Sequence, residues 1–119
     1  MIHIKRIYDS ASDDDGYRIL IDRLWPRGFS KEKANIDLWM KDIAPSTDLR
    51  KWFHHDFEKW KEFQAKYQKE LSGKIELLNE LLRLENEKGT ITLLYSTKDT
   101  QHNQARVLLA VLDNIAKTI

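Results

Sequence analysis

Short apolar runs alternate along this chain with longer stretches of helical periodicity, and this alternation restricts the possible folds most. Residues 2–8, 17–24 and 90–95 contain the branched and aromatic side chains that are typical of strands. Strands that alternate with helices favour a mainly parallel sheet covered by helices. The pattern therefore predicts an α/β fold, a small three-layer-like domain with a mainly parallel sheet of three or four strands flanked by helices.

The amphipathic stretches predict where the helices lie. Helices are expected over residues 46–73, interrupted near Asp56, over 75–89 and over 103–117, with a shorter one over 36–41. Apolar side chains repeat every three or four residues in these segments, as one buried face of a helix requires. The side chains expected in the core are Trp52, Trp60 and Phe63, then Ile75, Leu78, Leu81 and Leu82, and finally Val107, Leu108, Val111, Leu112 and Ile115.

The composition of the chain argues against several classes of function. The 119 residues suffice for one domain with its own core. The chain has 20 Lys and Arg residues and 19 Asp and Glu residues, so its net charge is +1. It therefore lacks the basic excess that is typical of nucleic-acid-binding proteins. The absence of cysteine excludes disulfides and thiol catalysis. The longest apolar run, residues 107–112, is far below the roughly 20 residues of a membrane span. We expect a single soluble domain, residues 1–119, in the cytoplasm.

Polar side chains follow two of the predicted strands. Asp22–Gly28 comes directly after the run Ile19–Ile21, and residues 96–99 follow the last strand. Ligands of open parallel sheets usually bind beyond the carboxyl ends of the strands, so both stretches should face one crevice. Planar guanidinium groups suit carboxylates and phosphates, and the sequence therefore predicts an anion-binding pocket at this edge.

The candidate residues of this pocket have different expected roles. The candidates for ligand binding are Arg23, Trp25, Arg27, Arg50, Ser96 and Lys98, and Asp22 and Asp99 are the catalytic acid–base candidates. The cationic groups would hold the anion, and Trp25 would form a wall. A structural alternative stays open, in which Arg23 pairs with Asp22, Asp37 or Asp99 and Trp25 belongs to the core. In this alternative Asp99 could instead cap the final helix.

No cofactor or metal is indicated by the motifs. The four glycines are not clustered into a phosphate-binding loop. His54, His55 and Asp56 invite a metal hypothesis, but adjacent histidines on a helix point about 100° apart and do not easily share one ion. We therefore expect no metal site.

Five motifs carry a family resemblance. They are Gly16–Arg18, Ile21–Gly28, Asp42–Ser46, Leu49–Phe53 and Leu93–Asp99. Through them nearly the whole chain resembles the bacterial YeaO-like proteins, the family called domain of unknown function 488. The resemblance implies a small α/β fold and brings no established activity. Broader members of the family carry Cys-His-Arg where this chain has Asn103, Gln104 and Ala105, so the thiol, imidazole and guanidinium of that trio are missing.

Three functions are compatible with these observations. The first is a pocket for a small anion, such as a nucleotide, a phosphate ester or a carboxylate, with catalysis left open. The second is a nucleic-acid accessory protein whose arginines contact phosphate, which the net charge of +1 disfavours. The third is an interaction protein with a vestigial pocket, which the missing trio favours. We expect no membrane association, and the sequence does not indicate an oligomeric state.

Overall fold

Four parallel strands form one sheet in the computed structural model, which describes residues 1–118. The strands are β1 (Ile2–Arg6), β2 (Tyr17–Leu20), β3 (Leu38–Trp39) and β4 (Ile91–Tyr95), and they lie in the order β1-β4-β2-β3. Every pair is parallel, and Leu93 of β4 lies between Ile4 of β1 and Ile19 of β2. The predicted α/β fold with a mainly parallel sheet is confirmed.

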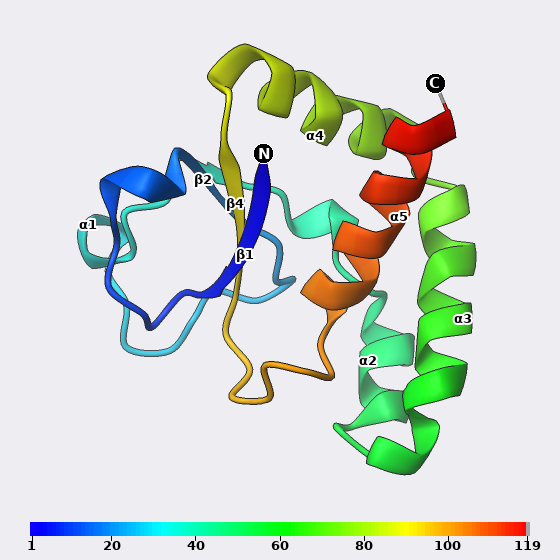
Figure 1. Cartoon of the computed structure of the whole chain (residues 1–119). Helices are drawn as coiled ribbons and strands as arrows, with labels where there is room; N and C mark the ends of the chain where they lie inside the picture. The colour runs from blue at the N-terminus through cyan, green and yellow to red at the C-terminus, as the bar shows by residue number, and fades with distance from the viewer. Residues whose placement is uncertain (119) are drawn as a thin grey trace.

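Helices cover the two faces of the sheet unequally (Figure 1). The larger layer consists of α2 (Thr47–Phe53), α3 (Trp60–Ser72), α4 (Ile75–Lys88) and α5 (Gln104–Thr118), and α1 (Lys31–Ala34) covers the opposite face with the loop before it. Single 3₁₀ turns occur at Asp13–Asp15, Lys41–Ile43 and Phe57–Lys59. Within residues 1–118 no helix combines the length and the apolar character that crossing a membrane requires.

The two central strands are buried on both faces. Ile19 and Leu93 contribute to the core beneath α3 and α5, and Leu20 and Leu94 pack on the other side against Ile7 and Ala34. All four of these strand residues are fully buried. A strand covered on both faces needs consecutive apolar residues rather than alternating ones, which explains the pairs Ile19–Leu20 in β2 and Leu93–Leu94 in β4.

The short helix predicted over residues 36–41 is wrong. This segment contains β3, whose Leu38 and Trp39 pair with Ile19 and Leu20 of β2. The backbone N–H of Met40 also donates to the carbonyl of Leu20. Because partners on β2 satisfy these backbone groups, the segment is extended and adds a short edge strand.

Of the twelve side chains predicted in the core, six are buried, five are half-buried and pack against the core (Trp52, Trp60, Leu82, Val111 and Ile115), and Ile75 is exposed. Phe63, Leu78, Leu81, Val107, Leu108 and Leu112 are buried. Trp52 and Trp60 are half-buried and pack on the core from its margin. Ile75, the first residue of α4, is 51% exposed, whereas Leu84 in the second half of that helix is buried.

A buried arginine ties the thin layer to the sheet. Arg18 on β2 forms an ion pair with Asp15, and its guanidinium also donates to the carbonyls of Ala34 and Asn35 at the end of α1. Lys5 on β1 contacts the same carboxylate at 3.1 Å. These contacts satisfy the buried charges and fix the loops on this face of the sheet.

Candidate functional site

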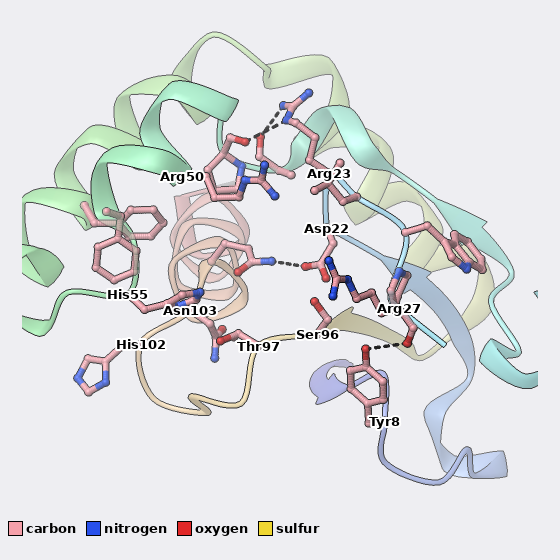
Figure 2. A pocket seen from close by; sticks show the side chains of 18 residues that line it. Tyr8, Asp22, Arg23, Arg27, Arg50, His55, Ser96, Thr97, His102 and Asn103 are labelled. Atoms are coloured by element: carbon pink, nitrogen blue, oxygen red, sulfur yellow. Dashed lines mark hydrogen bonds between the residues drawn. The ribbon is translucent and has the colours of Figure 1, made fainter. Parts of the chain in front are cut away.

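A cavity of about 370 Å³ opens at the carboxyl ends of β2 and β4, where the sequence predicts a pocket (Figure 2). Its walls come from the loop after β2, the region around α2, the loop after β4 and the start of α5. These segments meet because β2 and β4 are parallel neighbours. The lining includes the candidates Asp22, Arg23, Trp25, Arg27, Arg50 and Ser96, together with Tyr8, His55, Thr97, His102, Asn103 and Gln104.

Asp22 is a buried carboxylate in this lining, directly beyond β2. Its side-chain Oδ1 accepts a hydrogen bond of 2.5 Å from Nε2 of Gln104, at the start of α5. Its Oδ2 is buried and has no hydrogen-bond partner among residues 1–118. Burial raises the pKa of Asp22, and hydrogen bonding by Ser96 and Gln104 and the charge of Arg50 oppose this rise.

Arg23 is held by backbone carbonyls. Its Nε donates to the carbonyl of Pro45 at 3.1 Å, and its Nη2 donates to the carbonyl of Ala44 at 3.0 Å. Lys74 of α4 donates to the same Ala44 carbonyl at 3.0 Å. Arg23 therefore fixes the loop that precedes α2, and it contributes positive charge to the cavity without pairing with a carboxylate in the described part of the chain.

Arg27 and Arg50 carry guanidinium groups that make no hydrogen bond and no ion pair within residues 1–118. Both residues are exposed, and they come from different elements, the loop after β2 and helix α2. Figure 2 shows their side chains extending toward the cavity from two sides. The backbone carbonyl of Arg27 accepts a hydrogen bond of 3.2 Å from the hydroxyl of Tyr8, which helps to place this loop at the cavity mouth.

Trp25 forms part of the wall, as the sequence predicts, and is half-buried. Its Nε1 donates to the carbonyl of Phe29 at 2.7 Å, and its ring meets that of Trp39 edge-on with the centroids 5.3 Å apart. Trp39 in turn donates from Nε1 to the backbone carbonyl of Asp22 at 2.7 Å. The two indoles thus support the backbone at the end of β2.

Lys98 and Asp99 do not line the cavity, whereas Ser96 does. Lys98 is exposed. The Asp99 carboxylate accepts from the backbone N–H groups of Gln101 and His102 and contacts Nδ1 of His102 at 3.1 Å. Burial alone would raise the pKa of Asp99, but these hydrogen bonds outweigh it and lower the pKa. The expected convergence on one crevice therefore holds for Arg23 and Arg27 but not for Lys98 and Asp99.

The histidine motif lies at the end of α2 and not within it. The helix stops at Phe53, and His54 and His55 both have left-handed backbone conformations with φ of 43° and 55°. His55 lines the cavity, while His54 does not. No group of three or more His, Asp or Glu side chains in residues 1–118 is arranged to hold a metal ion.

Several lining residues are not among the sequence candidates. His102 and Gln104 reach the cavity from the turn before α5 and from its first residue, and the His102 ring packs edge-on against Phe57 and Trp60. Their only sequence signal is their position shortly after β4, at the same edge of the sheet as Asp22. Nothing in the local residue pattern predicts that Gln104 meets Asp22, 82 positions earlier.

Comparison with known proteins places the chain in a family. The family model described as the inactive DUF488-N3 subclade matches residues 1–118. The chain is 46% identical over 107 residues to the uncharacterised protein YeaO of Escherichia coli (strain K12), which covers 90% of this chain and 92% of that protein. It is 36% identical over 112 residues to an uncharacterised protein of Mycobacterium tuberculosis, covering 94% and 93% of the two chains. No solved structure matches the chain. The protein therefore belongs to the DUF488 family, in the subclade described as inactive.

Proposed function

We propose that this protein binds a small anionic molecule, such as a nucleotide, a phosphate ester or a carboxylate, in the cavity beyond β2 and β4. The observation that carries the proposal is the pair of unpartnered guanidinium groups, Arg27 and Arg50, that extend toward this cavity from two elements. Guanidinium groups form charge-assisted, often paired hydrogen bonds with phosphate and carboxylate oxygens. An anion between them would use donors that the described protein residues leave free.

The charge balance of the cavity supports an anionic ligand. Its lining contains three arginines and one carboxylate, Asp22, so its formal charge is positive even with Asp22 ionised. A positive potential inside a concave site attracts and concentrates anions. The chain as a whole has a net charge of only +1, so this excess is a local property of the cavity.

The size of the cavity favours a small molecule over a nucleic acid. Its volume of about 370 Å³ lies near the lower end of the roughly 300–1,000 Å³ typical of small-molecule pockets. The subclade description as inactive supports binding without conversion of the ligand. Asn103, Gln104 and Ala105 supply no thiol or other strong nucleophile at the start of α5, which agrees with a binding role.

Calorimetric titration with inorganic phosphate, adenosine monophosphate and citrate tests this proposal at fixed salt concentration. At least one of these probes should bind the wild-type protein, and Arg27→Ala and Arg50→Ala should each weaken that binding by about tenfold or more. Lys98→Ala is the matched control, because Lys98 is an exposed cation outside the cavity, and it should change the affinity less than about twofold.

Either of two kinds of result would contradict the proposal, one from the small-molecule probes and their control and one from DNA. The first is that none of the probes binds, or that Lys98→Ala weakens binding as much as the two arginine variants. The second is that duplex DNA binds more tightly than adenosine monophosphate and depends on the same arginines, which would favour the nucleic-acid alternative.

A further inference from the structure

We propose that Asp22 selects the ligand, so that the site prefers anions that also carry a hydroxyl or amino group over plain anions. This inference rests on the proposed anion-binding function and deepens it. In this arrangement Arg27 and Arg50 hold the anionic group, and the free carboxylate oxygen of Asp22 accepts a hydrogen bond from an O–H or N–H elsewhere on the same molecule. Hydroxylated or amino-substituted phosphate esters have this chemistry.

The first observation is the incomplete hydrogen bonding of Asp22. The residue is 8% exposed, its Oδ1 accepts from the Gln104 amide, and Ser96 is the other hydrogen-bonding residue beside the carboxylate. Oδ2 is buried without a hydrogen bond among the described residues. Buried polar atoms are nearly always paired, and an unpaired carboxylate oxygen in a cavity wall therefore indicates a donor supplied by a bound molecule.

The second observation is the set of groups that act on the Asp22 carboxylate against the effect of burial, which raises its pKa. Gln104 donates to Oδ1, and the charge of Arg50 and the hydrogen-bonding groups of Ser96 act in the same direction. All three favour the ionised carboxylate, which has no proton to donate. When Asp22 is ionised, its Oδ2 attracts an O–H or N–H and repels an anionic oxygen, which directs the anionic group of the ligand to the other part of the cavity.

The third observation is the difference in burial between the two kinds of group in the cavity. Asp22 is buried at its wall, whereas Arg27 and Arg50 are exposed. Figure 2 shows Asp22 between Arg50 and Ser96, with the Arg27 side chain reaching in from the loop after β2. A ligand that satisfies both regions has its anionic group at the exposed end and its hydroxyl or amino group at the buried end. Asp22 thus acts as a positioning and specificity-determining residue.

Matched pairs of phosphate esters test this inference, because the members of each pair share the anionic group and differ in the donor. The pairs are 2-aminoethyl phosphate with ethyl phosphate, and glycerol 3-phosphate with propyl phosphate. In calorimetric titrations of the wild-type protein, the donor-bearing member of at least one pair should bind about tenfold more tightly than its partner. In Asp22→Asn this preference should fall to about twofold or less, since a neutral amide is a weaker acceptor.

Asp99→Asn is the matched control, because Asp99 lies outside the cavity and an asparagine oxygen can accept the same backbone hydrogen bonds. This variant should keep the wild-type preference. Ethyl phosphate should bind Asp22→Asn at least as well as wild type, since the variant removes a negative charge from the cavity. If Asp22→Asn does not fold, the affinities of the two members of each pair for the wild-type protein still show whether the site prefers the ester with the extra donor.

The outcomes separate this inference from the proposal beneath it. One outcome is that the two members of each pair bind equally well to the wild-type protein, with binding that still depends on Arg27 and Arg50. In that case the selective role of Asp22 is wrong, while the proposed anion binding stands. A preference that persists unchanged in Asp22→Asn would also overturn the inference. If no ester binds, or if binding is insensitive to Arg27→Ala and Arg50→Ala, the proposed function itself fails.

Discussion

At the scale of single residues, Asp22 is the position where the structure departs furthest from what folding alone would favour. A buried polar atom without a partner costs about 1–3 kcal/mol of folding free energy, and Oδ2 of Asp22 is such an atom among the described residues. Sites of this kind in stable domains commonly serve binding or catalysis rather than stability. The stability of the free protein should therefore improve when this charge is removed.

The pH dependence of stability tests this expectation with the variant Asp22→Asn. Burial raises the folded-state pKa of Asp22 above its ordinary value of 3.8, so its contribution to stability is fully present below that value and is lost as pH rises through the folded pKa. Asparagine shows no such loss. In urea unfolding, Asp22→Asn should be as stable as wild type or more stable at pH 7, with a smaller advantage at pH 4.

The change in stability caused by Asp99→Asn at pH 7 should have the opposite sign to that caused by Asp22→Asn. The reason is that hydrogen bonds lower the pKa of Asp99 in the folded protein against the effect of burial. That contribution is present above the unfolded pKa and is lost as pH falls, so Asp99→Asn should be less stable than wild type at pH 7. An Asp22→Asn protein that loses stability relative to wild type between pH 4 and pH 7 would contradict the account of Asp22.

Sequence reasoning pointed to the edge of the sheet where the cavity lies, but it could not tell which side chains line this cavity. Arg27 and Ser96 follow β2 and β4 closely, and both line the cavity. Lys98 and Asp99 follow the same strand end as Ser96, yet the carboxylate of Asp99 turns back to accept hydrogen bonds from Gln101 and His102. Aspartate commonly forms such local turns. Whether its carboxylate binds the local backbone or points into the cavity depends on the geometry of the loop, which the order of residues does not reveal.

At the scale of elements, the aromatic contacts of α3 join α2 to the core. Phe63 is 3% exposed, and its ring stacks on Phe53 of α2 and on Trp60 at centroid distances of 4.4 and 5.6 Å. Trp60 is half-buried and lies at the margin of the same cluster. Because α2 carries Arg50, this packing also holds one wall of the cavity in place.

Truncation of these two aromatic residues should have unequal effects on stability. Phe63→Ala leaves a hole in the core and should cost about 3–5 kcal/mol of unfolding free energy, whereas Trp60→Ala should cost about 2 kcal/mol because Trp60 lies at the margin of the core and is only partly buried. Ile75→Ala, at a residue 51% exposed, is the control and should cost less than about 0.5 kcal/mol. Equal losses for Phe63→Ala and Trp60→Ala in urea unfolding would show that Trp60 is a core residue after all.

The elements that sequence reasoning found and missed differ in the strength of their periodicity. Leu108 and Leu112 belong to a long amphipathic repeat, and both are buried in α5 as predicted. The segment around Leu38 and Trp39 has no such repeat, and its extended form depends on hydrogen bonds from β2. A two-residue edge strand of this kind is determined by tertiary pairing and not by local propensity.

At the scale of the whole molecule, the site exists because parallel topology gathers distant segments. β2 and β4 are separated by four helices in the sequence and are neighbours in the sheet. Their carboxyl ends meet the loop before α2 and the start of α5, so Asp22, Arg50 and Gln104 share one cavity.

Amide and arginine side-chain NMR spectra recorded during titration with 2-aminoethyl phosphate test the central claim most directly. Anion binding in the cavity predicts saturable shift changes concentrated at residues 22–27, Arg50, residues 96–97 and residues 102–104, including the Nε–H signals of Arg27 and Arg50. Signals of the exposed face of α4, such as Arg83, should stay unchanged, because its guanidinium already pairs with Glu80 and Glu87. Shift changes confined to surfaces outside the cavity, or none at millimolar ligand, would contradict the claim.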